Sequence, residues 1–208
     1  MRNVIVGAFV SLDGVMQAPG GPDEDKESGF EHGGWVAPFW DEDVDKAMGL
    51  FMGEPFDLLL GRKTYDIFAA HWPRAEDSPD AETAKLFNSI TKYVATTSTA
   101  PLTWRNSVAI HDPAADVARL KKEDGPNLLV QGSTVLIQTL LQHGLVDQFN
   151  LLVFPVVLGK GKRLFETGAP AAALKLVNAT TSPSGVTIGS YVPAGSVQTG
   201  SFALPEDA

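Results

Sequence analysis

The 208-residue sequence contains no cysteine. This absence excludes disulfides, thiolate metal ligands and cysteine nucleophiles, and it favours a reducing compartment. No apolar run approaches the roughly 18 residues of a membrane-spanning helix. The apolar part of the amino-terminal segment is also too short for a signal peptide. We therefore expect a cytoplasmic protein that does not associate with a membrane.

Positive charge and histidine are scarce as well. Sixteen lysines and arginines face 25 aspartates and glutamates, which gives a net charge of −9. Nucleic-acid binding requires a basic surface, so we expect no nucleic-acid partner. The four histidines lack the spacing of helix-borne metal ligands, and we predict no metal site. Dinucleotide GxGxxG, P-loop and GxSxG motifs are absent too.

Apolar segments alternate with helical patterns as far as about residue 145. The pattern predicts strands at 4–14, 56–60, 92–97, 107–110, 127–131, 146–159, 173–180 and 186–193. It predicts helices at 41–53, 64–72, 80–90, 114–123 and 133–143, and a long loop at 17–40. We expect one α/β domain over residues 1–193, followed by a loosely ordered tail at 194–208. Its three layers would enclose a mixed, mostly parallel sheet that ends in an antiparallel hairpin.

Two of the predicted strand ends have the chemistry of an anion site. In both Gly61–Thr64 and Gln131–Thr134, a strand runs into glycine and a helix begins beside a hydroxyl residue. Arg62 and Lys63 oppose the helix dipole there unless an anion binds, because the amino end of a helix is already positive. The alternatives are a solvated charge pair and an ordinary turn with a Ser/Thr cap. Two such turns favour a ligand with more than one phosphate, such as a dinucleotide.

Carboxylates and aromatic residues near the same edge allow two interpretations each. Asp13 forms either an Asx turn or a substrate-facing carboxylate. One acid of the first helix, such as Asp45, either is solvated or holds a proton in the cleft. The aromatic segment from Trp35 to Trp40 either joins the core or forms the wall for a flat heterocycle.

Five segments occur together in an order and spacing that match a known family. They are VSLDGVM, LLLGRKTYDIF, LLVQGSTVLIQTLL, GLVDQFNLLVFPVVLGKGKRLF and GVTIGSYVP. Over about residues 2–193 the chain resembles the dihydrofolate reductase-like superfamily. The branch it resembles is named for the reductase domain of the riboflavin-biosynthesis deaminase-reductase. The resemblance implies a dihydrofolate reductase-like three-layer α/β/α fold, NADPH as cofactor and a homodimer.

The resemblance also assigns site residues by motif. Those assigned to the cofactor are Gly61, Arg62, Lys63 and Thr64 at its phosphates, Thr97 and Ser98 near the adenosine 2′-phosphate, and Gly132, Ser133 and Thr134 under the pyrophosphate. Those assigned to the substrate side and the cleft rim are Ser11, Asp13, Pro155, Leu158 and Gly159, and Gly159 is also assigned to the cofactor. We expect the loop that carries Trp35 to close over the substrate. Asp45 falls where the folate enzymes carry their acidic proton relay, and Asp13 is the other candidate acid.

The function implied is that of an NADPH-dependent reductase acting on a small heterocyclic, carbonyl or imine substrate, such as a pterin or a pyrimidine-like compound. The zinc deaminase motifs of the riboflavin enzymes are absent, so the chain cannot carry out the deamination. The alternative is a non-catalytic module that binds a nucleotide or other ligand and keeps the fold. The sequence leaves open the physiological substrate, the choice between NADPH and NADH, and the role of the acidic loop at 20–34.

Overall fold

Eight strands form one sheet in the computed structural model, which describes residues 1–202. The strands are β1 (Val4–Ser11), β2 (Phe56–Gly61), β3 (Lys92–Ala95), β4 (Ser107–Ile110), β5 (Asn127–Gln131), β6 (Gln148–Phe154), β7 (Leu174–Thr181) and β8 (Thr187–Pro193). Their order across the sheet is β4-β3-β2-β5-β1-β6-β8-β7. The first six run parallel, β8 is antiparallel to β6, and β7 is antiparallel to β8. The predicted mixed sheet with a closing hairpin is confirmed.

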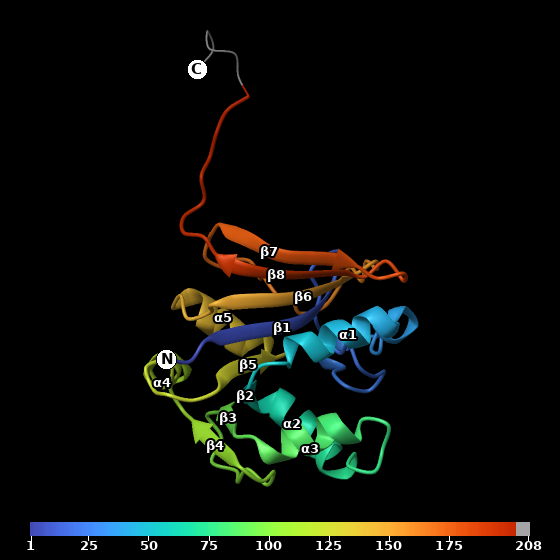
Figure 1. Ribbon diagram of the computed structural model, residues 1–208, viewed down its shortest axis with the longest axis vertical. Helices are drawn as coiled ribbons and strands as arrows, with labels where there is room; N and C mark the ends of the chain where they lie inside the picture. Colours follow the sequence, from blue (N-terminus) through green and yellow to red (C-terminus); the bar gives the residue numbers. More distant parts are fainter. Residues whose placement is uncertain (203–208) are drawn as a thin grey trace.

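Helices cover both faces of this sheet (Figure 1). They are α1 (Glu42–Phe51), α2 (Arg62–His71), α3 (Ala81–Ser89), α4 (Pro113–Leu120) and α5 (Thr134–Gln142), with short 3-10 turns at Glu27–Gly29, Ala37–Phe39 and Trp72–Arg74. Alternation along β2 sends Leu59 to the face under α4 and α5, and Leu58 and Leu60 to the face under α2 and α3. Because both faces are covered there, the inner strands are apolar almost throughout, whereas every residue of the edge strand β7 is exposed. This is the predicted three-layer α/β/α arrangement.

Two strands are shorter than the sequence indicated. β1 ends at Ser11 because the chain turns there, with the Gly14 N–H donating to the Ser11 carbonyl and Gly14 at φ 85°. β6 ends at Phe154 because the next residue is Pro155, which has no N–H to give to a ladder. The expected strand ends at 14 and 159 are therefore wrong. Both strands instead finish in turns on the same edge of the sheet.

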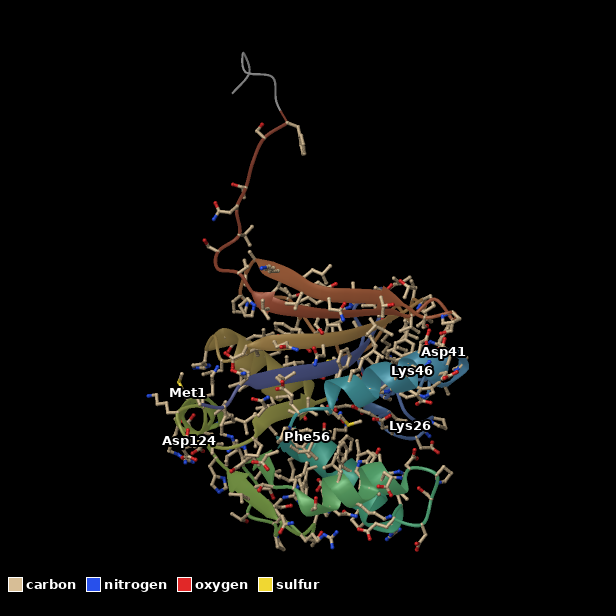
Figure 2. All side chains as sticks on the ribbon, in the orientation of Figure 1. Met1, Lys26, Asp41, Lys46, Phe56 and Asp124 are labelled. Atoms are coloured by element: carbon tan, nitrogen blue, oxygen red, sulfur yellow. The ribbon has the colours of Figure 1, made fainter. Side chains whose placement is uncertain are left out.

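The amino ends of the strands are fixed by a buried ion pair. Arg2, beside β1, contacts the carboxylate of Asp57 in β2, and its guanidinium lies 5.3 Å from the centre of the Tyr93 ring. Figure 2 shows Met1 and Asp124 at this end of the molecule and Lys26, in the acidic loop, on the opposite side. Arg2 thus contacts both Asp57 and Tyr93 at the amino edge of the sheet. The carboxyl edge remains as the place where a ligand can bind.

The segment expected to be a loose tail leaves the sheet after β8. Residues 194–202 form no helix or strand and extend away from the hairpin (Figure 1). The rest of the predicted tail, 203–208, lies outside the described residues. Within residues 1–202, no helix combines the length and apolar character needed to cross a membrane.

Candidate functional site

A cleft of about 1170 Å³ opens along the carboxyl edge of the sheet. It lies beyond the ends of β2, β3 and β5 and is bordered by α1 and the first turns of α2 and α5. Open α/β sheets place ligands at this edge. The predicted site residues that border the cleft are Asp45, Gly61, Arg62, Lys63, Thr64, Thr97, Ser98, Gly132, Ser133 and Thr134.

The two predicted anion turns are joined by one hydroxyl group. The Oγ of Ser133 accepts a hydrogen bond from the Gly61 N–H at 2.7 Å and donates to the Thr64 Oγ1 at 2.8 Å. Neither α2 nor α5 receives a side-chain cap at its amino end. The alternative that Ser133 caps its own helix is therefore not observed. The two helix ends are held side by side, and their first-turn N–H groups lack intrahelical partners.

Glycine is required where these turns meet. Gly132 has φ 64°, and an added Cβ would lie 3.4 Å from the Thr64 Oγ1. A Cβ on Gly61 would lie 3.2 Å from the Ser133 Oγ. Because Gly61 and Gly132 have no side chain, the backbone of both turns is exposed at these positions. Uncapped helix ends with exposed backbone fit a phosphate-bearing ligand.

The adjacent cations Arg62 and Lys63 point to different partners. The Arg62 guanidinium donates from Nε to Asp66 at 2.9 Å and from Nη1 to the Ala100 carbonyl at 3.1 Å. It therefore lies toward the loop after β3, which carries Thr97 and Ser98. Lys63 instead reaches the acidic loop. The sequence does not distinguish the roles of Arg62 and Lys63, whereas their different contacts in the structure do.

Lys63 takes part in a cluster of four charges, which we call the lysine–carboxylate cluster. Its Nζ lies 2.6 Å from Asp25 and 2.8 Å from Glu27, and the Nζ of Lys162 lies 2.8 and 2.6 Å from the same carboxylates. Burial opposes the ionisation of Asp25, but the two ammonium groups outweigh it and lower its pKa to about 2. The same lysines lower the pKa of Glu27. Both carboxylates are therefore ionised at neutral pH.

A buried glutamine fixes this cluster to the cleft. The Gln17 Nε2 donates to the carbonyls of Asp25 and Glu27, each at 3.1 Å, and its Oε1 accepts from the Lys162 N–H at 3.0 Å. The acidic loop thus has a defined place beside α2. Within that loop, burial raises the pKa of Glu24, whose carboxylate also borders the cleft.

The part of the cleft near α1 is apolar and aromatic, with one carboxylate. Phe9 and Trp40 meet edge to face at 5.6 Å, and Met48 borders the same space. The Trp40 Nε1 donates to the Asp45 Oδ1 at 2.6 Å. A half-exposed indole can stack on a flat ring, and the oriented carboxylate beside it can accept the N–H groups of that ring.

Asp13 does not border this cleft. Its carboxylate accepts hydrogen bonds from the Ser11 hydroxyl at 2.7 Å and from the N–H groups of Leu158 and Gly159 at 3.0 and 2.8 Å, and Arg163 lies 3.2 Å away. Burial opposes its ionisation, but the hydrogen bonds from Ser11, Leu158 and Gly159 outweigh burial and lower the pKa of Asp13 to about 2. Asp13 ties the turn after β1 to the loop after β6.

Five other predicted site residues also lie away from the cleft. Trp35 is buried against Phe154 and donates from Nε1 to the Gln17 carbonyl at 2.8 Å. Ser11 is buried beneath the Asp13 turn, Leu158 packs against the core around α1, and Pro155 is exposed beside Gly185. Gly159, which donates to Asp13, is the fifth, and the structure thus separates these residues from the two anion turns.

Several residues that border the cleft were not singled out from the sequence, among them His111, Lys162 and Glu24. His111 follows β4 directly, and the strand-end pattern would have found it had that short strand been included. Lys162 lies in the loop after β6, and Glu24 in the acidic loop at 20–34. No local pattern indicates that these two loops meet.

Comparisons with known proteins agree with this fold. The family model for the RibD C-terminal domain matches residues 2–188. Protein YyaP of Bacillus subtilis (strain 168) is 33% identical over 190 residues, covering 89% of this chain and 92% of YyaP.

Two solved structures share the fold. A protein assigned to riboflavin biosynthesis from Shewanella sp. PV-4 aligns with a TM-score of 0.65 at 21% identity, over 93% of this chain and 99% of that one. Dihydrofolate reductase from Enterococcus faecalis, complexed with NADP(H) and RAB-propyl, aligns with a TM-score of 0.56 at 12% identity, over 92% and 96%. The fold is thus dihydrofolate reductase-like, and the chain belongs to the RibD C-terminal domain family.

Proposed function

We propose that the protein is an NADPH-dependent reductase that transfers hydride to a small heterocyclic, carbonyl or imine substrate. The observation that carries the proposal is the Ser133 hydroxyl bridge, which holds two uncapped helix ends together at the carboxyl edge. The cleft volume of about 1170 Å³ exceeds the roughly 300–1,000 Å³ usual for one small ligand. Such a volume suits a dinucleotide and a substrate together.

The residues present fit the cofactor's phosphates. Gly132, Ser133 and Thr134 would hold the pyrophosphate together with Thr64, through hydroxyl groups and first-turn N–H groups. Lys63 would add a positive charge beside them. When bound, the cofactor supplies the hydride, and the protein's part is to position it and the substrate.

Arg62, Thr97 and Ser98 would receive the 2′-phosphate. The contact from Arg62 to Ala100 places its guanidinium at the loop that carries both hydroxyl groups. The Nη2 of Arg62 has no hydrogen-bond partner among the described residues and is free to donate. A planar guanidinium suits a phosphate monoester because it donates two parallel hydrogen bonds.

Asp45 is the residue we propose for the substrate side. Its carboxylate lies in the aromatic part of the cleft, where it would accept N–H groups of a pterin or pyrimidine-like ring and relay a proton. Trp40 orients it, and the surrounding aromatic side chains exclude water. By analogy with the family, the proposal extends to a cytoplasmic homodimer.

The test is a fluorescence titration of NADPH and NADH with wild type and Arg62→Ala. We expect NADPH binding to weaken about 10- to 100-fold, since hydrogen bonds to charged groups contribute roughly 1.5–3 kcal/mol, and NADH binding to change little. Arg119→Ala is the matched control, because Arg119 also pairs with an acid four residues on, Glu123. Equal losses for both cofactors would contradict the role of Arg62 at the 2′-phosphate.

Turnover distinguishes an enzyme from a binding module. NADPH absorbance is followed with dihydrofolate and with the ribosylaminopyrimidine of the riboflavin pathway. Tight NADPH binding without oxidation by any substrate offered would favour a non-catalytic module. Failure of wild type to bind NADPH would refute the proposed function altogether.

A further inference from the structure

Three neighbouring strands end in register at one side of the cleft. Gly61 of β2 pairs with Ala95 of β3, and Ala95 pairs with Ile110 of β4. The residues that follow are Arg62, Thr96 and His111. Since β3 lies between β2 and β4, the arginine and the histidine flank the loop after β3 from opposite sides.

Hydrogen bonds connect this loop to both flanking residues. The His111 Nδ1 lies 2.8 Å from the Thr96 carbonyl, and the Thr96 Oγ1 accepts from the Ser98 N–H at 3.0 Å. Further along, the Ser98 Oγ accepts from the Ala100 N–H at 3.1 Å, and the Ala100 carbonyl accepts from Arg62. The loop with its exposed hydroxyl groups is therefore held between two basic side chains.

The contact to the Thr96 carbonyl fixes which nitrogen of the His111 ring carries a hydrogen. A carbonyl oxygen only accepts, so Nδ1 carries the hydrogen. The other nitrogen, Nε2, has no partner among the described residues, and the exposed ring borders the cleft. In the neutral ring Nε2 is an acceptor, which an anion repels. In the protonated ring it becomes a charged donor, which an anion attracts.

The charged groups on the adjoining elements are mostly engaged with each other. On α2, Arg62 pairs with Asp66. On α4, Asp112 accepts from the Ala115 N–H, and Asp116 accepts from the Asp112 N–H and pairs with Arg119. These carboxylates sit at the start of α4, beside His111 in the chain. An anion between His111 and Arg62 would thus meet two donors that have no competing acid between them on the loop.

We propose that His111 is a second residue that recognises the 2′-phosphate of the cofactor, binding it through protonated Nε2 on the side of the loop opposite Arg62. The assignment rests on the proposed function, because that function supplies the phosphate. It makes the preference for NADPH over NADH depend on pH. Arg62 would supply the part of that preference that does not depend on pH, and His111 the part that does.

The experiment measures binding of 2′,5′-ADP and of 5′-AMP, which differ only by the 2′-phosphate, by calorimetry at pH 6 and pH 8. The variant is His111→Gln. The control is His143→Gln, whose Nδ1 contacts a carbonyl, that of Thr139, in the same way, while its ring does not border the cleft. Comparing variant with wild type at each pH removes the titration of the phosphate itself, which falls near pH 6.

We expect the preference of wild type for 2′,5′-ADP over AMP to exceed that of His111→Gln by about tenfold at pH 6, which corresponds to one hydrogen bond to a charged group. The excess should be smaller at pH 8, because a deprotonated Nε2 no longer donates, and His143→Gln should match wild type. Equal preferences for 2′,5′-ADP over AMP in wild type and His111→Gln at pH 6 would overturn the role of His111. That result would leave the proposed function untouched.

Two further outcomes would show which step of the proposal is wrong. A His111 dependence seen with ribose 5-phosphate and not with 2′,5′-ADP would assign the phosphate to a substrate and overturn the proposal. If wild type bound neither nucleotide, the proposed function would fail together with it. Circular dichroism melts of each variant confirm that the exposed substitution leaves the fold intact.

Discussion

Replacing Asp13 by asparagine tests whether this carboxylate holds the structure together. The side chain keeps its size but loses the charge that accepts from Ser11, Leu158 and Gly159. Lowering a carboxyl pKa from 3.8 to about 2 stabilises the folded state by about 2 kcal/mol at pH 7. Only 20% of the side chain is exposed, so solvent screening reduces this value little.

The sign of the pH dependence follows from the lowered pKa. Asp13 stabilises the fold at every pH well above its unfolded value near 4, and this contribution is lost as the pH falls toward 2. The stability gap between wild type and Asp13→Asn should therefore shrink from about 2 kcal/mol at pH 7 to about 1 kcal/mol at pH 3. Urea unfolding at both pH values measures it.

A matched control removes the general effect of charge. Asp124 is fully exposed, and among residues 1–202 its side chain contacts the amino terminus, so Asp124→Asn should leave stability nearly unchanged. If Asp13→Asn costs no more than this control, the hydrogen-bonded carboxylate does not stabilise the fold. If it leaves stability intact and abolishes turnover, the catalytic interpretation of Asp13 is correct instead.

Two further substitutions test the cleft itself. Gly132→Ala should lower stability by about 1 kcal/mol, because φ is 64°, and should also weaken NADPH binding, because the new methyl crowds Thr64. Gly144→Ala has a similar φ, 61°, in open space, and should reproduce the stability loss in thermal melts without the binding loss in titrations. Asp45→Asn should lower kcat about 100-fold or more at unchanged NADPH affinity, as expected for a lost proton relay, whereas Asp43→Asn on the same helix turn should not. Steady-state rates with the substrate that oxidises NADPH decide this, and an unchanged kcat would remove Asp45 from the chemistry.

The elements that sequence predicted well are those with local patterns. Apolar strands, helix starts and glycine turns each depend on neighbours in the chain, and parallel strands bring their carboxyl ends to one edge. The strand-end pattern therefore predicts that Gly61–Thr64 and Gly132–Thr134 lie at the same edge of the sheet, and in the structure they do. Their shared hydroxyl bridge was not foreseen, because it joins residues 72 positions apart.

The residues that sequence placed less well lie in loops. Asp13 binds N–H groups about 145 positions away, and no periodicity encodes such a contact. Trp35 is buried because its loop folds back over the core, although loops usually run over the surface. Lys63 and the acidic loop are paired across 38 positions for the same reason. Loop conformation depends on tertiary contacts that a local pattern does not contain.

The lysine–carboxylate cluster also affects how a ligand finds the cleft. Its two ammonium groups are cancelled by two carboxylates, and Arg62 is offset by Asp66. An anion that is still out of hydrogen-bonding reach therefore meets mainly the net charge of −9, whose repulsion salt screens over a Debye length of about 8 Å. Diffusional encounter with a polyanionic dinucleotide gains no electrostatic acceleration from this protein, and added salt should raise the association rate. Attraction begins only at contact, once individual hydrogen-bond donors are within reach.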